Sequence, residues 1–209
     1  MEIKKLPLNK DQYYSTKHKK THIFLHHTAG GSVASAMASW NSTKERVATA
    51  YIIERNGEVY EAFNPDYWAY SLGVTGATAL EKATIGIELV AFGPLTRVAG
   101  KFFTWTNREI PKNEVAEFDP PYRGSRYYHD YTISQMSSLC QLLKMLNEKY
   151  KIPLDNLKEG SSKYVDYRDW KKLPSGVWSH TTVRKDKSDI LPIHLRLYCK
   201  EALGAPFFF

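Results

Sequence analysis

The sequence predicts a single α/β domain in which a central mixed β-sheet is flanked by helices. Short apolar strands recur in the N-terminal half, an asparagine–glycine turn joins two of them into a hairpin, and helical segments lie between and after them. The 209 residues are 43% hydrophobic, which is enough for one sizeable core but not comfortably for two. We therefore expect one folded domain.

The elements of the N-terminal half follow one another closely. Residues 21–28 (THIFLHHT) are apolar and β-rich, which predicts a buried strand ended by an alanine–glycine–glycine turn. Ser32 is then the expected N-cap of a short alanine-rich helix. Residues 48–54 and 58–63 flank Asn56-Gly57 and predict a hairpin, and residues 84–91 (TIGIELVA) predict a central strand.

The C-terminal half begins with an irregular region. Residues 94–131 contain four prolines and many aromatic and charged residues without a sustained period, so we expect an elaborated loop insertion that is ordered. Thr132 and Gln135 form a capping box at the start of an amphipathic helix over 132–150. Residues 176–183 predict an extended segment, and residues 190–203 predict a final helix.

Charge and hydropathy limit the surroundings of the protein. The net charge of +7 favours polyanionic partners, namely nucleic acid, an anionic membrane or a phosphate-rich cell wall. Many lysines lie in residues 1–20, which we expect to form a basic, solvated N-terminal arm. No apolar signal segment follows the start and no run approaches the ~18 residues that span a bilayer, so we expect cytoplasmic synthesis and no membrane insertion. Cys140 and Cys199 are predicted to be buried, reduced thiols.

Histidines and a carboxylate suggest a metal site. His26 and His27 are adjacent on a predicted strand, so their side chains point to opposite faces and only one of them can serve a given site. His180 is followed by Lys187 and Asp189 in a segment poor in apolar residues. Two neutral imidazoles, one carboxylate and an open fourth position form a catalytic zinc site, if the fold brings them together.

Several segments in this order resemble a known family. The segments IFLHHTAGG, ATAYIIERNGEVYEAF, TIGIELV and GVWSH followed by K-S-D are similar to those of zinc-dependent N-acetylmuramoyl-L-alanine amidases of the type 2 class. That class includes phage endolysins, bacterial recycling amidases and peptidoglycan recognition proteins. The resemblance implies a type 2 amidase-like fold, with residues 21–209 as the catalytic domain.

The resemblance also implies roles for particular residues. The first histidine of HHTAG corresponds to a zinc ligand, which selects His26 over His27, and His180 corresponds to the second ligand. A lysine followed two places later by aspartate selects Asp189 as the third ligand. Asp186 is the alternative third ligand, but it lacks a lysine two places before it.

Two catalytic residues are expected beside the zinc. Glu88, the only carboxylate in the TIGIELV strand, corresponds to the general base of recycling-type amidases, and Lys187 would stabilise the oxyanion. Other members of the family use a tyrosine where this chain has Thr49, and this departure also favours Glu88 as the base.

Two further positions depart from the family pattern. Ala50 replaces a usual histidine, and Ile190-Leu191 replaces a usual proline–glycine after the third ligand. None of these positions is a predicted ligand, so the expected zinc site is retained. The other histidines that match no family position are expected to be structural: His22, His129 and His194.

The expected function is zinc-dependent hydrolysis of the amide between N-acetylmuramic acid and L-alanine in peptidoglycan. We expect a monomeric phage endolysin that reaches the cell wall after release, because the basic charge and the aromatic insertion suit an anionic polymer. The alternatives are a cytosolic recycling amidase acting on soluble muropeptides and a non-catalytic peptidoglycan-binding module. No nucleic-acid-binding motif accompanies the charge, so nucleic acid is not an expected partner.

Overall fold

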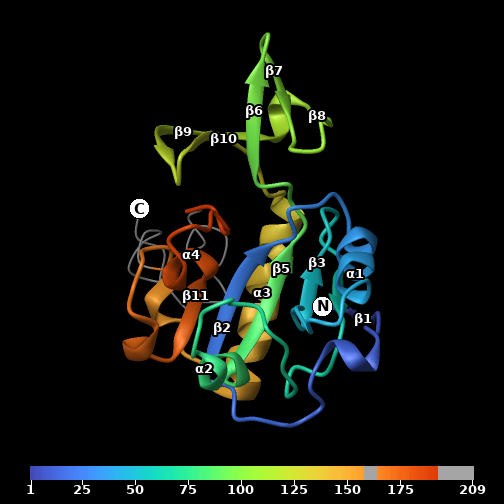
Figure 1. Cartoon of the computed structure of the whole chain (residues 1–209), viewed down its shortest axis with the longest axis vertical. Helices are drawn as coiled ribbons and strands as arrows, with labels where there is room; N and C mark the ends of the chain where they lie inside the picture. The colour runs from blue at the N-terminus through green and yellow to red at the C-terminus, as the bar shows by residue number, and fades with distance from the viewer. Residues whose placement is uncertain (158–163, 193–209) are drawn as a thin grey trace.

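The computed structural model describes residues 1–157 and 164–192. It contains two β-sheets, and the second lies beyond one end of the first (Figure 1). The main sheet has six strands in the order β1-β4-β3-β5-β2-β11. The strands are β1 (Ile3–Lys5), β2 (His22–His27), β3 (Tyr51–Ile53), β4 (Val59–Glu61), β5 (Thr84–Leu89) and β11 (Gly176–Ser179). β3 and β4 pair antiparallel and the other neighbours pair parallel, so the predicted central mixed sheet is confirmed.

Helices cover the main sheet and complete the α/β fold. They are α1 (Val33–Asn41), α2 (Thr78–Lys82), α3 (Ile133–Tyr150) and α4 (His180–Val183), with short 3-10 turns at Lys10–Gln12, Lys112–Glu114, Asp155–Leu157 and Trp170–Lys172. The predicted N-caps are confirmed, because Ser32 caps α1 and Thr132 forms a capping box with Gln135 at the start of α3. None of the described helices is long and apolar enough to cross a bilayer.

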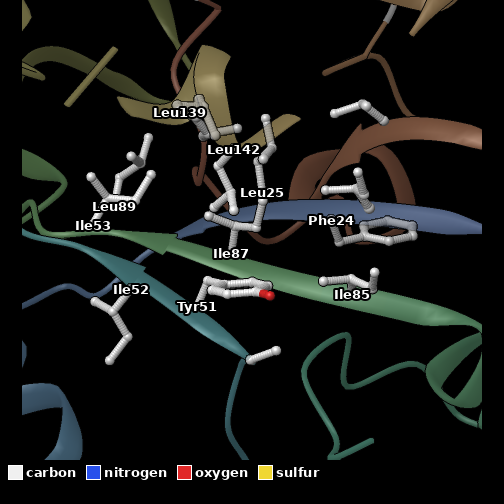
Figure 2. Close-up of a cluster of buried hydrophobic side chains, with 14 of the residues drawn as sticks. Phe24, Leu25, Tyr51, Ile52, Ile53, Ile85, Ile87, Leu89, Leu139 and Leu142 are labelled. Carbon is white, nitrogen blue, oxygen red and sulfur yellow. The ribbon is translucent and has the colours of Figure 1, made fainter. Parts of the chain in front are cut away.

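The core lies between the main sheet and α3. Leu139 and Leu142 of α3 point toward Leu25 and Ile87 of the two central strands, and all four side chains are at most 1% exposed (Figure 2). Burying one such side chain contributes about 1.5–3 kcal/mol. The central strand predicted over 84–91 is confirmed as β5, which ends at Leu89 and pairs with β2 and β3.

The N-terminal residues differ from the solvated arm that we expected. β1 pairs parallel with β4 at the edge of the main sheet, and Leu8 is 3% exposed. Lys20 is also buried, and its ammonium donates to the carbonyls of Tyr67, Lys82 and Thr84. Two of the three β1 residues are exposed lysines, which is why the sequence suggested a solvated arm.

The insertion is a second sheet and not an elaborated loop. Its order is β8-β7-β6-β10-β9, and every pair is antiparallel. The strands are β6 (Pro94–Val98), β7 (Lys101–Phe103), β8 (Glu109–Ile110), β9 (Val115–Tyr122) and β10 (Ser125–His129). A small core of Phe92, Leu95, Phe102 and Ile110 supports this "upper sheet", which stands above the main sheet in Figure 1.

The C-terminal expectations have mixed outcomes. Residues 176–179 form the expected strand, but the segment continues as α4. Cys140 is disulfide-bonded, so its prediction as a reduced thiol is wrong. Neither the expectation for Cys199 nor most of the expected helix over 190–203 can be compared, because residues 193–209 lie outside the described residues.

Candidate metal centre and cleft

A cleft of about 370 Å³ opens where the main sheet meets the upper sheet. It lies at the carboxyl ends of β2 and β5, the edge at which parallel sheets commonly bind ligands. All five residues that the sequence singled out line this cleft: His26, Glu88, His180, Lys187 and Asp189. The fold therefore brings together groups that are separated by up to 163 residues along the chain.

The register of β2 against β5 positions the first part of the site. His26 pairs with Glu88, so both side chains project from the same face of the sheet. His27 pairs with Leu89 on the opposite face, and its Nδ1 lies 3.3 Å from the Tyr131 hydroxyl. The alternation predicted for the histidine pair thus places His26 beside Glu88.

His180 is oriented by its place at the first turn of α4. Ser179 precedes it as the N-cap residue, and the His180 side chain is 7% exposed. Its Nε2 lies 2.9 Å from the Leu72 carbonyl, which can only accept a hydrogen bond. This contact makes Nε2 a hydrogen-bond donor and leaves Nδ1 as the nitrogen that can bind a metal ion.

Asp189 completes the group from the loop after α4. Its backbone carbonyl accepts a hydrogen bond from the Thr181 amide, and its Oδ2 lies 3.0 Å from His180 Nδ1 and 3.2 Å from His26 Nδ1. Burial opposes ionisation, but the adjoining His180 and His26 rings outweigh it and hold the pKa of Asp189 well below its usual range. Burial lowers the pKa of His26 to about 4, so that ring is neutral at neutral pH.

The three converging atoms have the geometry of a metal site. His26 Nδ1 and His180 Nδ1 are 3.2 Å apart, similar to their distances from Asp189 Oδ2. A tetrahedral zinc ion with ligand bonds of about 2.0–2.1 Å separates its ligands by about 3.3 Å. A carboxylate oxygen that faces an imidazole lone pair in a buried site is stabilised by a proton or a metal cation placed between them. The chemistry and spacing of this donor set therefore fit zinc.

Glu88 has an environment that few carboxylates share. Its Oε2 is buried and has no hydrogen-bond partner among the described residues. Burial, with a further contribution from the charge of Asp189, raises the pKa of Glu88 well above its usual value. Thr49 also lines the cleft, but its hydroxyl donates to the Tyr51 carbonyl. Glu88 is therefore available for proton transfer, whereas the Thr49 hydroxyl is already engaged.

Two features around the metal centre escaped the sequence analysis. The first is Trp105, which lines the mouth of the cleft from the β7–β8 turn. The second is the β9–β10 turn, where the Tyr122 hydroxyl donates to the Ile190 carbonyl and Arg123 donates to Val165 and Thr181. Nothing in the sequence indicated that Trp105 lines the cleft or that the β9–β10 turn contacts Ile190, the residue after Asp189.

Two of the remaining histidines have structural contacts, as expected. His22 Nε2 lies 3.3 Å from the Leu173 carbonyl. His129 Nδ1 accepts from the Phe92 amide, and its Nε2 lies 3.2 Å from Glu114. His194 lies outside the described residues.

Solved structures share this fold at low sequence identity. A mutant form of PlyL aligns with a TM-score of 0.53 and 11% identity, covering 99% of this chain and 100% of its own. The hydrolase AmiA of Staphylococcus aureus, solved with its ligand, aligns at 0.55 and 12%, covering 97% and 84%. A selenomethionine derivative of AmpD aligns at 0.53 and 14%, covering 94% of each chain.

The family assignment comes from the sequence itself. No curated protein shows a significant match to the chain. A family model described as N-acetylmuramoyl-L-alanine amidase matches residues 16–192, which include every residue of the cleft discussed above. The chain therefore belongs to the N-acetylmuramoyl-L-alanine amidase family and is an amide hydrolase of peptidoglycan.

Proposed function

We propose that the protein hydrolyses the amide between N-acetylmuramic acid and L-alanine with a zinc ion held by His26, His180 and Asp189. The convergence of two imidazole nitrogens and one carboxylate oxygen within 3.0–3.2 Å of one another carries this proposal. Three protein ligands leave the fourth tetrahedral position open, as in catalytic zinc sites. When bound, zinc would polarise the amide carbonyl and lower the pKa of a water molecule to about 7.

Glu88 is the proposed proton carrier. Its unpartnered Oε2 would accept the proton of the attacking water and deliver it to the nitrogen of L-alanine as the C–N bond breaks. The hydroxyl remains on the muramoyl carbonyl carbon as a carboxylic acid, and the amine leaves with the proton. A carboxyl group with a raised pKa suits both halves of this transfer.

Lys187 is the proposed oxyanion-stabilising group. It lines the same cleft two residues before Asp189, on the loop that follows α4. An ammonium directed at the carbonyl oxygen stabilises negative charge that develops only in the transition state, which lowers the barrier to hydrolysis. This role complements that of Glu88, which handles the proton and not the oxyanion.

The proposed biological role is that of a phage endolysin acting on polymeric peptidoglycan. The net charge of +7 favours binding to an anionic envelope. The upper sheet also extends the lining of the cleft beyond the metal centre. A recycling amidase acting on soluble muropeptides is the alternative. The presence of all three proposed ligands argues against a non-catalytic binding module.

Two measurements on the purified protein test the proposal. Elemental mass spectrometry should find about one zinc ion per chain. Digestion of purified sacculi should release free L-alanine amino termini without new reducing sugars. A chelated sample that regains activity with zinc is the matched control. New reducing sugars without L-alanine termini would contradict the amidase assignment, and activity confined to small muropeptides would favour the recycling role.

A further inference from the structure

The upper sheet has a second hollow beside the catalytic cleft. This hollow of about 460 Å³ is lined by six residues of β6, β7 and the turn after β7: Thr96, Val98, Phe103, Thr104, Trp105 and Asn107. Trp105 lines both this hollow and the catalytic cleft. The two hollows therefore both border Trp105, so a polymer lying in the cleft passes next to the second hollow at this residue.

Trp105 is exposed but held in place. Its side chain is 72% exposed, the largest exposure of any aromatic residue among those described, yet its Nε1 donates a 2.9 Å hydrogen bond to the Ala29 carbonyl. Ala29 belongs to the turn directly after β2, which carries His26. The ring thus bridges the upper sheet and the main sheet, and its remaining surface is open to solvent.

The turn that carries Trp105 is rigid. Thr104 is 3% exposed, its amide donates to the Arg108 carbonyl, and its carbonyl accepts from the Asn107 amide. Its hydroxyl oxygen also accepts from the amides of Thr106 and Arg108. A side chain fixed before binding loses little conformational entropy when a ligand arrives. This exposed tryptophan is therefore preorganised for contact.

The lining of the second hollow indicates which ligand it suits. None of its six residues is charged, and two charged neighbours on the adjoining strands, Lys101 and Glu109, pair with each other at 2.9 Å. Hydroxyl and amide groups of Thr96 and Asn107 lie beside the rings of Phe103 and Trp105. Flat aromatic faces next to uncharged hydrogen-bonding groups match a neutral sugar, which has apolar C–H faces and hydroxyl edges. A charged stem peptide would find no ionic partner in this lining.

We propose that Trp105 and the hollow on β6–β7 bind the glycan strand of the substrate, with the Trp105 ring stacking on a sugar next to the one whose amide is cut. The proposal rests on the proposed function for the position of the glycan strand relative to the cleaved amide. Binding of the sugar itself requires no catalysis. It assigns the upper sheet a role as a built-in glycan-binding surface continuous with the cleft.

A binding experiment tests the proposal without catalysis. The probe is a neutral tetrasaccharide of N-acetylglucosamine, titrated by calorimetry into the full chain. We expect binding that weakens about tenfold in Trp105→Ala, in line with what one aromatic stacking contact contributes. Tyr167→Ala is the matched control, because it removes a ring that is 49% exposed and lines neither hollow, and it should bind as the wild type does.

A second variant is needed because Trp105→Ala could also disturb the folding of the turn that carries it. Thr96→Arg places a long side chain on an exposed strand position and leaves Trp105 intact, so it should also weaken tetrasaccharide binding by filling the hollow. Equal tetrasaccharide affinity in the wild type and in both variants, or no binding by the wild type, would overturn the proposal.

Activity measurements separate this proposal from the proposed function. On sacculi, Trp105→Ala should raise KM about tenfold with kcat little changed. Its loss on a muramoyl peptide with a single sugar should be smaller, and Tyr167→Ala, which lines neither hollow, should keep the wild-type KM on both substrates. Equal KM values on sacculi would count against the glycan surface while leaving the amidase intact. Failure of the wild type to cut either substrate would contradict the amidase chemistry alone, and the tetrasaccharide result would still stand.

Discussion

The two sheets of this protein are built on opposite principles. The central strands of the main sheet are buried on both faces, with Ile23, Phe24 and Leu25 each 0% exposed, and one face ends in the metal-binding group. In the upper sheet, β6 has one buried residue among five, and its small core contains only four buried side chains. The comparison shows that the buried main sheet positions the metal-binding side chains, whereas the exposed upper sheet lines the cleft around them.

The largest effect should come from the metal ligands on the main-sheet side of the cleft. Substituting His26, His180 or Asp189 by alanine should remove zinc and activity together, because a three-ligand site has no spare donor. Metal content and amidase turnover measure this directly. His27→Ala is the control, since His27 points away from the group, and it should keep its zinc. If His26→Ala kept its zinc and its activity, His27 and not His26 would be the ligand.

The next effect should come from Glu88. Glu88→Gln preserves the shape of the side chain but cannot accept a proton, so turnover should fall about 10²-fold or more while zinc content and thermal stability are kept. Thr49→Ala should be mild, because the Thr49 hydroxyl is engaged by the Tyr51 carbonyl. If Thr49→Ala lost turnover while Glu88→Gln kept it, a group other than Glu88 would activate the water.

A smaller effect is expected where the upper sheet contacts the loop of Asp189. Arg123→Ala removes donors to the carbonyls of Lys185, in the loop before Asp189, and of Thr181, whose amide donates to the Asp189 carbonyl. Zinc affinity should therefore fall about tenfold, because the segment that carries Asp189 is held less firmly. Competition with a chromophoric chelator measures that affinity. Arg126→Ala in the same sheet removes only exposed ion pairs with Glu117 and Asp119 and should have no effect. Equal affinities in the two variants would show that the upper sheet does not support the metal centre.

The smallest effect should be that of salt. The positive charge of the chain attracts an anionic envelope, and screening shortens from about 10 Å at 0.1 M to about 3 Å at 1 M ionic strength. Hydrolysis of whole envelopes should therefore slow several-fold over this range, while hydrolysis of a small muramoyl peptide changes little. Parallel rate measurements on both substrates check this. An equal response of the two substrates would rule out charge as the cause of wall affinity.

Local patterns explain why the main sheet was predictable. The capping box at Thr132 and Gln135 and the asparagine–glycine turn at Gly57 act within a few residues, and both occur where expected. The approach of His26, His180 and Asp189 depends instead on pairing between β2 and β11, which no local signal encodes. The residue types suggested a metal site, but only the resemblance to the amidase family selected His26 over His27 and Asp189 over Asp186.

The upper sheet could not be predicted for a physical reason. β6, β7 and β8 are short, and the eight-residue β9 contains no buried residue, so the period-2 alternation that marks a half-buried strand is weak. Prolines at 94, 111, 120 and 121 also suggested breaks, yet Pro94, Pro120 and Pro121 lie within strands β6 and β9. Likewise, the lysines of β1 indicated a solvated arm, although an edge strand tolerates such exposed charges.

The junction between the sheets has a mechanical consequence. The chain leaves the main sheet at Phe92-Gly93 and returns at His129, and these two passages are tied together by the hydrogen bonds from the His129 amide to the Gly93 carbonyl and from the Phe92 amide to His129 Nδ1. Gly93 has a φ of 78°, and a Cβ there would lie 2.7 Å from His27 Nε2. The two chain passages therefore join the sheets at one place, and the contacts of Trp105 with Ala29 and of Tyr122 with Ile190 tie the upper sheet to the main domain at two others. At Gly93, the positive φ and the nearby His27 ring both disfavour a side chain.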